Sequence, residues 1–105
     1  MSLTREQFIE GLDQNLLEVR QKFEQKNKAY GKGLDAFHNF RASAVRIHGE
    51  GTPDNMFTVL LTLMDKHLVA LANRGLDDPE FQERMMDLVV YGLIALGIYK
   101  EKIKS

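Results

Sequence analysis

Two carboxylates in the last third of the chain have the spacing of a cation site. Glu83 and Asp87 stand one helical turn apart, so on a helix they share one face. Residues 85–99 are apolar nearly all round apart from Asp87, which indicates a core helix that carries this carboxylate into the interior. A buried carboxylate has to be paired, bind a cation or take up a proton. The pattern therefore predicts an enclosed negative charge that needs a cationic companion.

Two kinds of positive charge could neutralise Asp87. The first is Mg2+, because it binds one or two carboxylates and fills its other positions with water and phosphate oxygens. The second reading is an ion pair between Asp87 and Arg84, Lys66 or another base, which would leave no metal to bind.

The segment 26–33 has the ingredients of a phosphate-plus-base site. It holds Lys26, Lys28 and Lys32, the ring of Tyr30 and two glycines. A solvated surface turn is an equally good interpretation of the same residues, and no Gly-rich phosphate motif of the Walker or dinucleotide type is present. His67, on the apolar face of its helix, is expected to be a hydrogen-bonded core histidine rather than a metal ligand.

Four helices are predicted to position these residues, and no stretch alternates polar and apolar residues as a half-buried strand does. Thr4 and Gln7 form a capping box at the start of the first helix, and Thr52 followed by Pro53 starts the third. The expected helices span 5 to about 27, 35–48, 53 to about 73, and about 80 to 102, with a loop at 26–33.

Several packing expectations follow from the same periodicity. An apolar stripe runs along the first helix through Phe8, Leu12, Leu16, Val19 and Phe23. The second helix is expected to turn Phe37, Phe40, Ala44 and Ile47 inward. Gly92 and Gly97, inside the last helix, are expected at close helix crossings, because glycine costs about 1 kcal/mol there relative to alanine.

Composition bounds the function. The 105 residues form one domain, 1–105, of all-α class, with a core thin enough to benefit from an oligomer interface. Without cysteine, a metal has to be held by oxygen or histidine ligands. With 14 basic and 15 acidic residues, no duplex nucleic acid is expected as a partner. No signal peptide is apparent and the run 85–99 is shorter than a bilayer span, so a cytoplasmic protein without a membrane partner is expected.

The order of short motifs resembles a family. The segment from Lys26 to Gly31, then Asn39-Phe40, Asp65-Lys66, and Glu83 with Asp87 before Tyr91, looks like the phage-borne nucleotide-modification-associated proteins. These are similar in layout to the MazG-like all-α nucleoside triphosphate pyrophosphohydrolases. The resemblance spans roughly residues 22–100. It implies a MazG-like helical bundle, completed as a dimer or tetramer, in the cytoplasm of a bacterial or phage-infected cell.

The resemblance also implies chemistry. It implies cleavage of a nucleotide between the α and β phosphates with Mg2+ bound by Asp87, Glu83 and Asp65. In that scheme cationic side chains contact phosphate and aromatic rings stack on the base; the former are Lys66, Lys28, Lys32 and Arg41, and the latter Tyr30 and Phe40. The chain departs from the better-studied enzymes, because it has no E-x-x-E pair before Asp65 and has Arg84 three residues before Asp87.

Two further functions stay open at the level of sequence. The chain has fewer candidate metal ligands than the better-studied enzymes, so nucleotide binding without hydrolysis is one of these functions. A non-catalytic phage accessory or structural protein, whose last helix serves oligomerisation, is the alternative from another class. A helix-turn-helix DNA-binding protein is disfavoured, because Arg41 and Arg46 around an Ala-Ser-Ala stretch are too little to define a recognition helix.

Overall fold

The chain folds into four helices, and the computed structural model describes residues 2–30 and 35–104, with side chains for 2–25 and 35–104. The helices are α1 (Arg5–Tyr30), α2 (His38–His48), α3 (Pro53–Arg74) and α4 (Phe81–Lys104), with a short 3-10 turn, η1 (Gly75–Asp77), before α4. Over the described residues there is no strand. The predicted all-α class with four main helices is confirmed.

The helix starts follow the capping signals in the sequence. The backbone N–H of Gln7 donates to Thr4 Oγ1 at 3.1 Å, and the Thr4 N–H donates to Gln7 Oε1 at 2.9 Å. At α3, Thr52 Oγ1 accepts a hydrogen bond from the Asn55 N–H at 3.2 Å, and Pro53 is the first helical residue. These side chains satisfy N–H groups that have no partner inside the helix.

Two predicted boundaries are wrong. α1 continues to Tyr30, so residues 26–30 are helical rather than part of a loop, because the glycines that end the helix come only after them. α2 begins at His38 and not at Asp35. The Asp35 carboxylate accepts a hydrogen bond from the Phe37 N–H at 2.9 Å, which holds a turn ahead of the helix.

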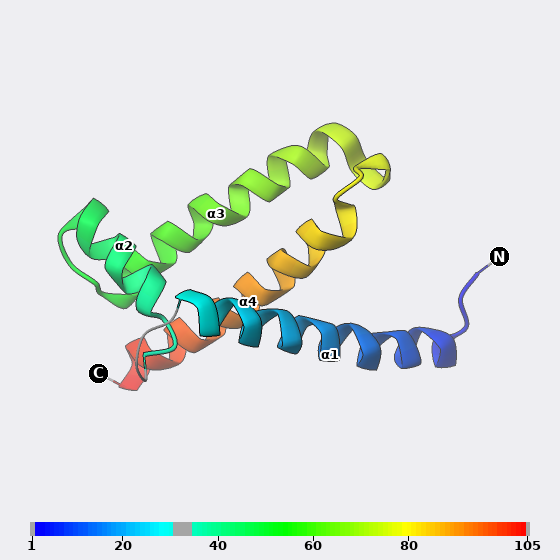
Figure 1. The fold of residues 1–105 in the computed structure, drawn as a ribbon, viewed down its shortest axis with the longest axis horizontal. Coiled ribbons are helices and arrows are strands. Elements are labelled where there is room, and N and C mark those ends of the chain that lie inside the picture. The colour runs from blue at the N-terminus through cyan, green and yellow to red at the C-terminus, as the bar shows by residue number, and fades with distance from the viewer. Residues whose placement is uncertain (1, 31–34, 105) are drawn as a thin grey trace.

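α3 and α4 form the centre of the fold, a helical hairpin joined by η1 (Figure 1). α2 packs against the beginning of α3, and the carboxyl-terminal half of α1 crosses α4, while the amino-terminal half of α1 extends beyond the other helices (Figure 1). Side chains from all four helices make the core. Its buried apolar members are Val19, Ala44, Met56, Val59, Leu60, Val90, Ile94 and Ile98.

One of the two glycines has a close neighbour inside the chain. A Cβ placed on Gly97 would stand 2.6 Å from the ring of Phe37, so that ring would have to move to admit a side chain. A Cβ on Gly92 would meet nothing within 4 Å. The neighbour of Gly97 is an aromatic ring ahead of α2 rather than the backbone of a crossing helix, so the structure does not show the expected helix crossing at either glycine.

We expected neighbouring helices to enclose α4 from Met85 onward, and within a single chain this expectation is wrong. Met85, Val89, Leu96 and Tyr99 are 39 to 59% exposed, on the side of α4 opposite its buried residues, and Leu93, between the two sides, is 52% exposed. The fold is correspondingly open, with a radius of gyration of 15.8 Å against about 13 Å for a compact domain of this size.

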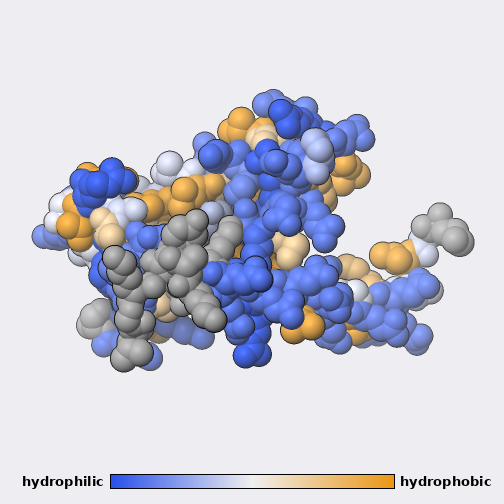
Figure 2. Space-filling model, viewed as in Figure 1, coloured by the Kyte–Doolittle hydropathy of each residue, from blue (hydrophilic) through white to orange (hydrophobic). Residues whose placement is uncertain are grey.

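Apolar exposure extends to the other helices. Ile47, expected to point inward, is 55% exposed. The stripe of α1 is exposed at Phe8, Leu12 and Leu16, because this part of the helix projects past α4. Figure 2 shows apolar side chains at the surface along α3 and along the projecting part of α1. Four helices of this length do not cover one another's apolar faces within one chain.

One helical stretch among the described residues, Pro53–Asp77, is long and apolar enough to cross a membrane by length and composition alone. A core helix of a soluble protein meets the same criteria. In this fold Met56, Val59 and Leu60 are buried against neighbouring helices, whereas only 11% of the apolar window as a whole is buried.

The start of α4 is held by Asp78, which is only 4% exposed. Its Oδ1 accepts a hydrogen bond from the Glu80 N–H at 2.8 Å, and its Oδ2 accepts one from Arg84 Nε at 2.9 Å. The hydrogen bond from Glu80 lowers the pKa of Asp78, burial opposes that effect, and Arg84 lowers the pKa further, with a net decrease from the usual value. The ionised carboxylate is therefore part of the folded structure.

Replacing Gly97 tests the close contact with Phe37. Gly97→Ala is expected to destabilise the fold by about 1 to 3 kcal/mol, because the added Cβ overlaps a ring that is packed against the core. Gly11→Ala is the matched control, since a Cβ there meets nothing within 4 Å and alanine favours the helix. Thermal unfolding measures both. A Gly97→Ala protein as stable as Gly11→Ala would contradict the packing described.

Acid unfolding tests the role of Asp78. Because its pKa is lowered in the folded state, its contribution to stability is present above the unfolded pKa of about 4 and is lost as the pH falls further. Asp78→Asn should therefore melt below the wild type at pH 7, and the difference in melting temperature should shrink on acidification towards about pH 2. A difference that stays constant over that range would refute the assignment.

Candidate functional site

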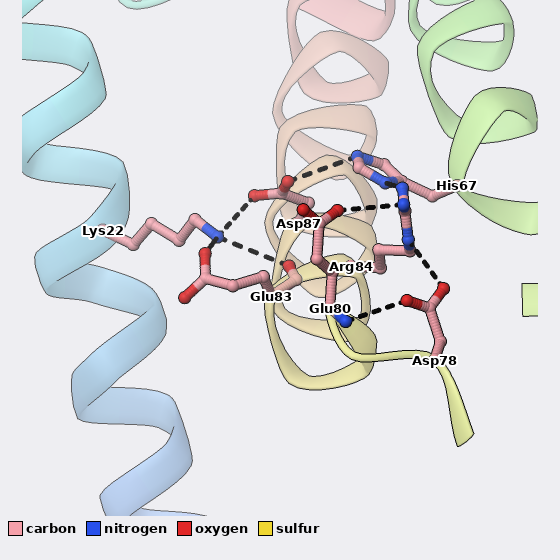
Figure 3. Close-up of polar contacts among 7 residues, drawn as sticks. All are labelled: Lys22, His67, Asp78, Glu80, Glu83, Arg84 and Asp87. Carbon is pink, nitrogen blue, oxygen red and sulfur yellow. Dashed lines mark hydrogen bonds and ion pairs between the residues drawn. The ribbon is translucent and has the colours of Figure 1, made fainter. Parts of the chain in front are cut away.

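Asp87 lies where α1, α3 and α4 meet, and its side chain is 14% exposed. Its Oδ1 is 2.8 Å from Lys22 Nζ on α1, and its Oδ2 is 3.2 Å from His67 Nε2 on α3 (Figure 3). One carboxylate thus joins three helices. The structure thus encloses Asp87 next to a cationic group, as predicted. The opposite side of α4 is exposed.

Lys22 connects both carboxylates that the sequence singled out. Its Nζ donates to Glu83 Oε2 at 2.7 Å as well as contacting Asp87, and its side chain is 15% exposed. Burial alone lowers the pKa of Lys22, but the hydrogen bonds to Asp87 and Glu83 outweigh it, so the net pKa is raised. The ammonium group therefore lies charged between the two carboxylates, at the position where the sequence suggested a metal ion.

His67 is fixed by partners on both ring nitrogens. Arg84 Nη1 approaches His67 Nδ1 at 3.4 Å, and a guanidinium N–H only donates. Nδ1 is then the acceptor, which leaves a ring proton on Nε2, the nitrogen that lies 3.2 Å from Asp87 Oδ2. This assignment follows from the network of neighbours. His67 is a hydrogen-bonded interior histidine, the role expected from its place on the apolar face.

Arg84 extends the network to the start of α4. It donates to His67, to Asp78 through Nε at 2.9 Å and to Glu80 Oε2 through Nη2 at 2.9 Å (Figure 3). The charged groups from Lys22 to Asp78 form one connected chain of contacts, which we call the α4 polar cluster; it consists of Lys22, His67, Asp78, Glu80, Glu83, Arg84 and Asp87. No buried side-chain N or O atom lacks a hydrogen-bond partner over the described residues.

An aromatic residue lies beside the cluster. The rings of Tyr91 and His67 have centroids 6.1 Å apart and are tilted by 31°. Burial raises the pKa of the Tyr91 hydroxyl, and the negative charge of Asp87 raises it further. Tyr91 therefore remains neutral at physiological pH.

The remaining predicted metal and phosphate ligands of α3 lie outside the cluster. Asp65 and Lys66 are exposed, and neither makes an ion pair with another described residue. Asp65 precedes His67 by two residues, which puts it on nearly the opposite side of α3. Over the described residues, no group of three or more His, Cys, Asp or Glu side chains is placed to hold a metal ion.

Arg41, expected to contact phosphate, lies in a separate ion-pair cluster at the other end of α4. It contacts Asp35 Oδ2 at 2.9 Å and Glu101 Oε1 at 2.7 Å, and it donates to the Gly51 carbonyl at 3.1 Å. Hydrogen bonds to Glu101 and then Asp35 raise the pKa of Arg41. Arg41 also lowers the pKa of Asp35. These contacts tie α2 to the end of α4.

The predicted base-stacking and loop residues are divided between the core and the undescribed part. Phe40 is half-buried and packs against the hydrophobic core. The side chains of Lys28, Tyr30 and Lys32 lie outside the described residues. Of the residues expected at the site, the structure brings together Glu83 and Asp87.

The sequence analysis missed Lys22. The signal for it was modest: Lys22 flanks the apolar stripe of α1 next to Val19 and Phe23, so its stem follows the stripe into the interface while its ammonium reaches α4. Arg84 was considered only as a partner of Asp87. It serves instead as the link between Asp78 and His67.

Comparison with known protein families, with curated proteins and with solved structures finds no match for this chain. Its function therefore has to be inferred from the geometry of the α4 polar cluster and from the surfaces around it.

Proposed function

We propose that this chain is a Mg2+-dependent nucleotide-binding protein that hydrolyses nucleoside triphosphates between the α and β phosphates at the α4 polar cluster. The observation that supports it is the convergence of Glu83 and Asp87 on a single cation, at 2.7 and 2.8 Å. Two carboxylates directed at one point also suit Mg2+, which binds one or two of them and takes its other ligands from water and substrate phosphates.

The proposal gives Lys22 two partners in turn. Without nucleotide its ammonium neutralises Glu83 and Asp87, which removes the electrostatic need for a metal ion in the resting protein. With nucleotide bound the ammonium would instead contact a phosphate oxygen, and Glu83 and Asp87 would be the residues that hold Mg2+. A lysine is suited to this exchange, because its charge is carried on a flexible four-carbon stem.

The neighbours of the carboxylates keep them in position during that exchange. His67 Nε2 lies 3.2 Å from Asp87 Oδ2, which leaves Oδ1 directed at the cation. Arg84 fixes the imidazole from behind and is itself held by Asp78. Such outer contacts orient the groups that bind a metal. When bound, Mg2+ would polarise the phosphate and stabilise the charge that develops on it as water attacks.

Turnover tests the proposed activity. With Mg2+ and a panel of canonical and modified nucleoside triphosphates, we expect release of pyrophosphate, and Asp87→Asn and Glu83→Gln should each reduce it by about 10- to 100-fold or more. Asp65→Asn is the matched control, because this exposed carboxylate lies outside the cluster, and it should leave turnover unchanged. Absence of pyrophosphate with every triphosphate, or full activity in a folded Asp87→Asn protein, would refute the proposal.

Mg2+ binding without nucleotide tests the exchange of partners. Lys22→Met removes the ammonium from between the carboxylates, so Mg2+ alone should raise the melting temperature of this variant more than that of the wild type. Lys66→Met, which removes an exposed lysine outside the cluster, should respond like the wild type. Equal responses of Lys22→Met and wild type to Mg2+ would mean that the carboxylate pair does not form a cation site.

A second candidate function is that of a non-catalytic structural protein that works by self-association. It is favoured by the uncovered apolar side of α4, which is unrelated to the polar cluster. In that case every ion pair of the cluster serves only to join the helices, and Mg2+ changes neither the melting temperature nor the assembly.

A further inference from the structure

The α4 polar cluster is enclosed more tightly than its proposed substrate allows. The side chains of Lys22 and Asp87 are 15 and 14% exposed, and those of His67 and Arg84 are each 16% exposed. A nucleoside triphosphate with its Mg2+ is a large hydrated group, so it reaches Asp87 only after a covering element has moved. The contacts of each helix around Asp87 indicate which one moves.

α1 is attached to the other helices over a short stretch. Among its described residues only Val19 is buried, and the apolar residues one and two turns earlier, Leu16 and Leu12, are 48 and 42% exposed. Phe23 packs against the core from a partly buried position. The amino-terminal half of α1 extends past the hairpin of α3 and α4 (Figure 1). Elements with few buried apolar contacts are those that open locally at the lowest free energy.

A groove runs along the contact between α1 and α4. It has a volume of about 310 Å3, and its lining includes Leu16, Val19 and Phe23 of α1 together with Val90 and Leu93 of α4. Protein interiors are close-packed, with few voids larger than a water molecule. The contact between α1 and α4 is looser than that, so lifting α1 forfeits fewer van der Waals contacts than separating two closely packed helices.

A single cation fastens the described part of α1 to α4. Among the described side chains of α1, only Lys22 makes polar contacts with another helix. Its Nζ lies 2.7 Å from Glu83 Oε2, 2.8 Å from Asp87 Oδ1 and 3.4 Å from the Glu83 carbonyl oxygen. The charge that holds α1 down is therefore also the charge that Mg2+ would replace between the two carboxylates.

The other three helices keep contacts of their own. α3 packs against both α2 and α4, and Ala44, Met56 and Leu60 of these helices have no exposed surface. Arg41 of α2 is 2.7 Å from Glu101 near the end of α4. α2, α3 and α4 thus form a body whose contacts do not pass through α1, and α1 is the element that can leave it.

We propose that α1 is a lid over the α4 polar cluster, fastened by Lys22, which lifts from α4 to admit the triphosphate and closes on it through the same lysine. The identity of the ligand rests on the proposed function, whereas the lifting of α1 is a property of the chain alone. In the closed protein without nucleotide, Glu83 and Asp87 hold the ammonium of Lys22. With nucleotide, a phosphate oxygen would hold it, and the closed lid keeps water away from the reacting phosphate.

The reactivity of a buried thiol measures the lifting of α1 without any nucleotide. Because the chain has no cysteine, Val90→Cys places a single thiol in the groove under α1, at a position that is 6% exposed. Val59→Cys is the matched control, since this valine of α3 is 8% exposed and does not line the groove. The rate of modification by a bulky maleimide is measured for each under native conditions.

The lid predicts how this rate depends on Lys22. Adding Lys22→Met should accelerate modification of Val90→Cys by about 10-fold or more, because the fastening charge is lost, and should leave Val59→Cys unchanged. Adding Arg5→Met, which removes an exposed cation from the projecting part of α1, should change neither rate. Circular dichroism checks that every variant is folded.

Holding α1 closed tests whether the lid admits the substrate. Leu16→Cys and Leu93→Cys place thiols on α1 and α4 in the lining of one groove, and a cleavable bis-maleimide joins them. With Mg2+ and the triphosphate panel, pyrophosphate release should fall by about 10-fold or more in the joined protein and return once the linker is cleaved.

Three outcomes would overturn the lid. They are a rate for Val90→Cys that Lys22→Met leaves unchanged, an equal acceleration of Val90→Cys and Val59→Cys, which would mean that the whole fold loosens, and full pyrophosphate release by the joined protein. Failure of the proposed function is distinguishable from these. Accelerated modification of Val90→Cys in a protein that releases no pyrophosphate would refute the hydrolysis and support the lifting of α1.

Discussion

The ion pair between Lys22 and Asp87 is the interaction on which the arrangement of the helices depends. α1 covers α4 only with its carboxyl-terminal half, where the apolar contact comes from Val19 and Phe23. With so little apolar area, a 2.8 Å contact between largely buried charges fixes where α1 crosses α4. Removing either partner would leave the other charge in the interior, which is costlier than leaving it in water. Through His67 the same carboxylate also ties α3 to the site.

Much of the helical structure could be predicted from the sequence, because the residues that start and end helices act locally. Capping residues such as Thr4 and Thr52 gave helix starts, and Gly49, with its positive φ of 88°, gave the end of α2. The enclosure of Asp87 followed from apolar residues around it. The identity of its partner did not, because Lys22 is far away along the chain and only the crossing of α1 over α4 brings it near. Periodicity predicts which face of a helix is buried, and says nothing of which neighbouring residue stands there.

The error about α4 has the same origin and is informative. An all-round apolar helix was expected to be enclosed, and the fold encloses only the side that holds Val90, Ile94 and Ile98. A hydrophobic pattern indicates that one face of a helix is apolar. It does not distinguish a face buried inside one chain from a face buried between chains. Gly92 and Gly97 illustrate the difference, since the first finds no neighbour in the chain and the second lies under Phe37. α4 therefore presents a polar cluster to its own chain and leaves an apolar face that this chain does not cover.

The coupling between Lys22 and Asp87 is the most direct measure of this account. Urea unfolding of Lys22→Met, Asp87→Asn and the double variant gives the coupling free energy of the pair without attributing to it the unpaired charge left in each single variant. A pair that fixes the crossing of α1 over α4 should give about 1 kcal/mol or more. Free energies of unfolding that add to within about 0.5 kcal/mol would mean that these two residues act independently and that the helices are held by other contacts.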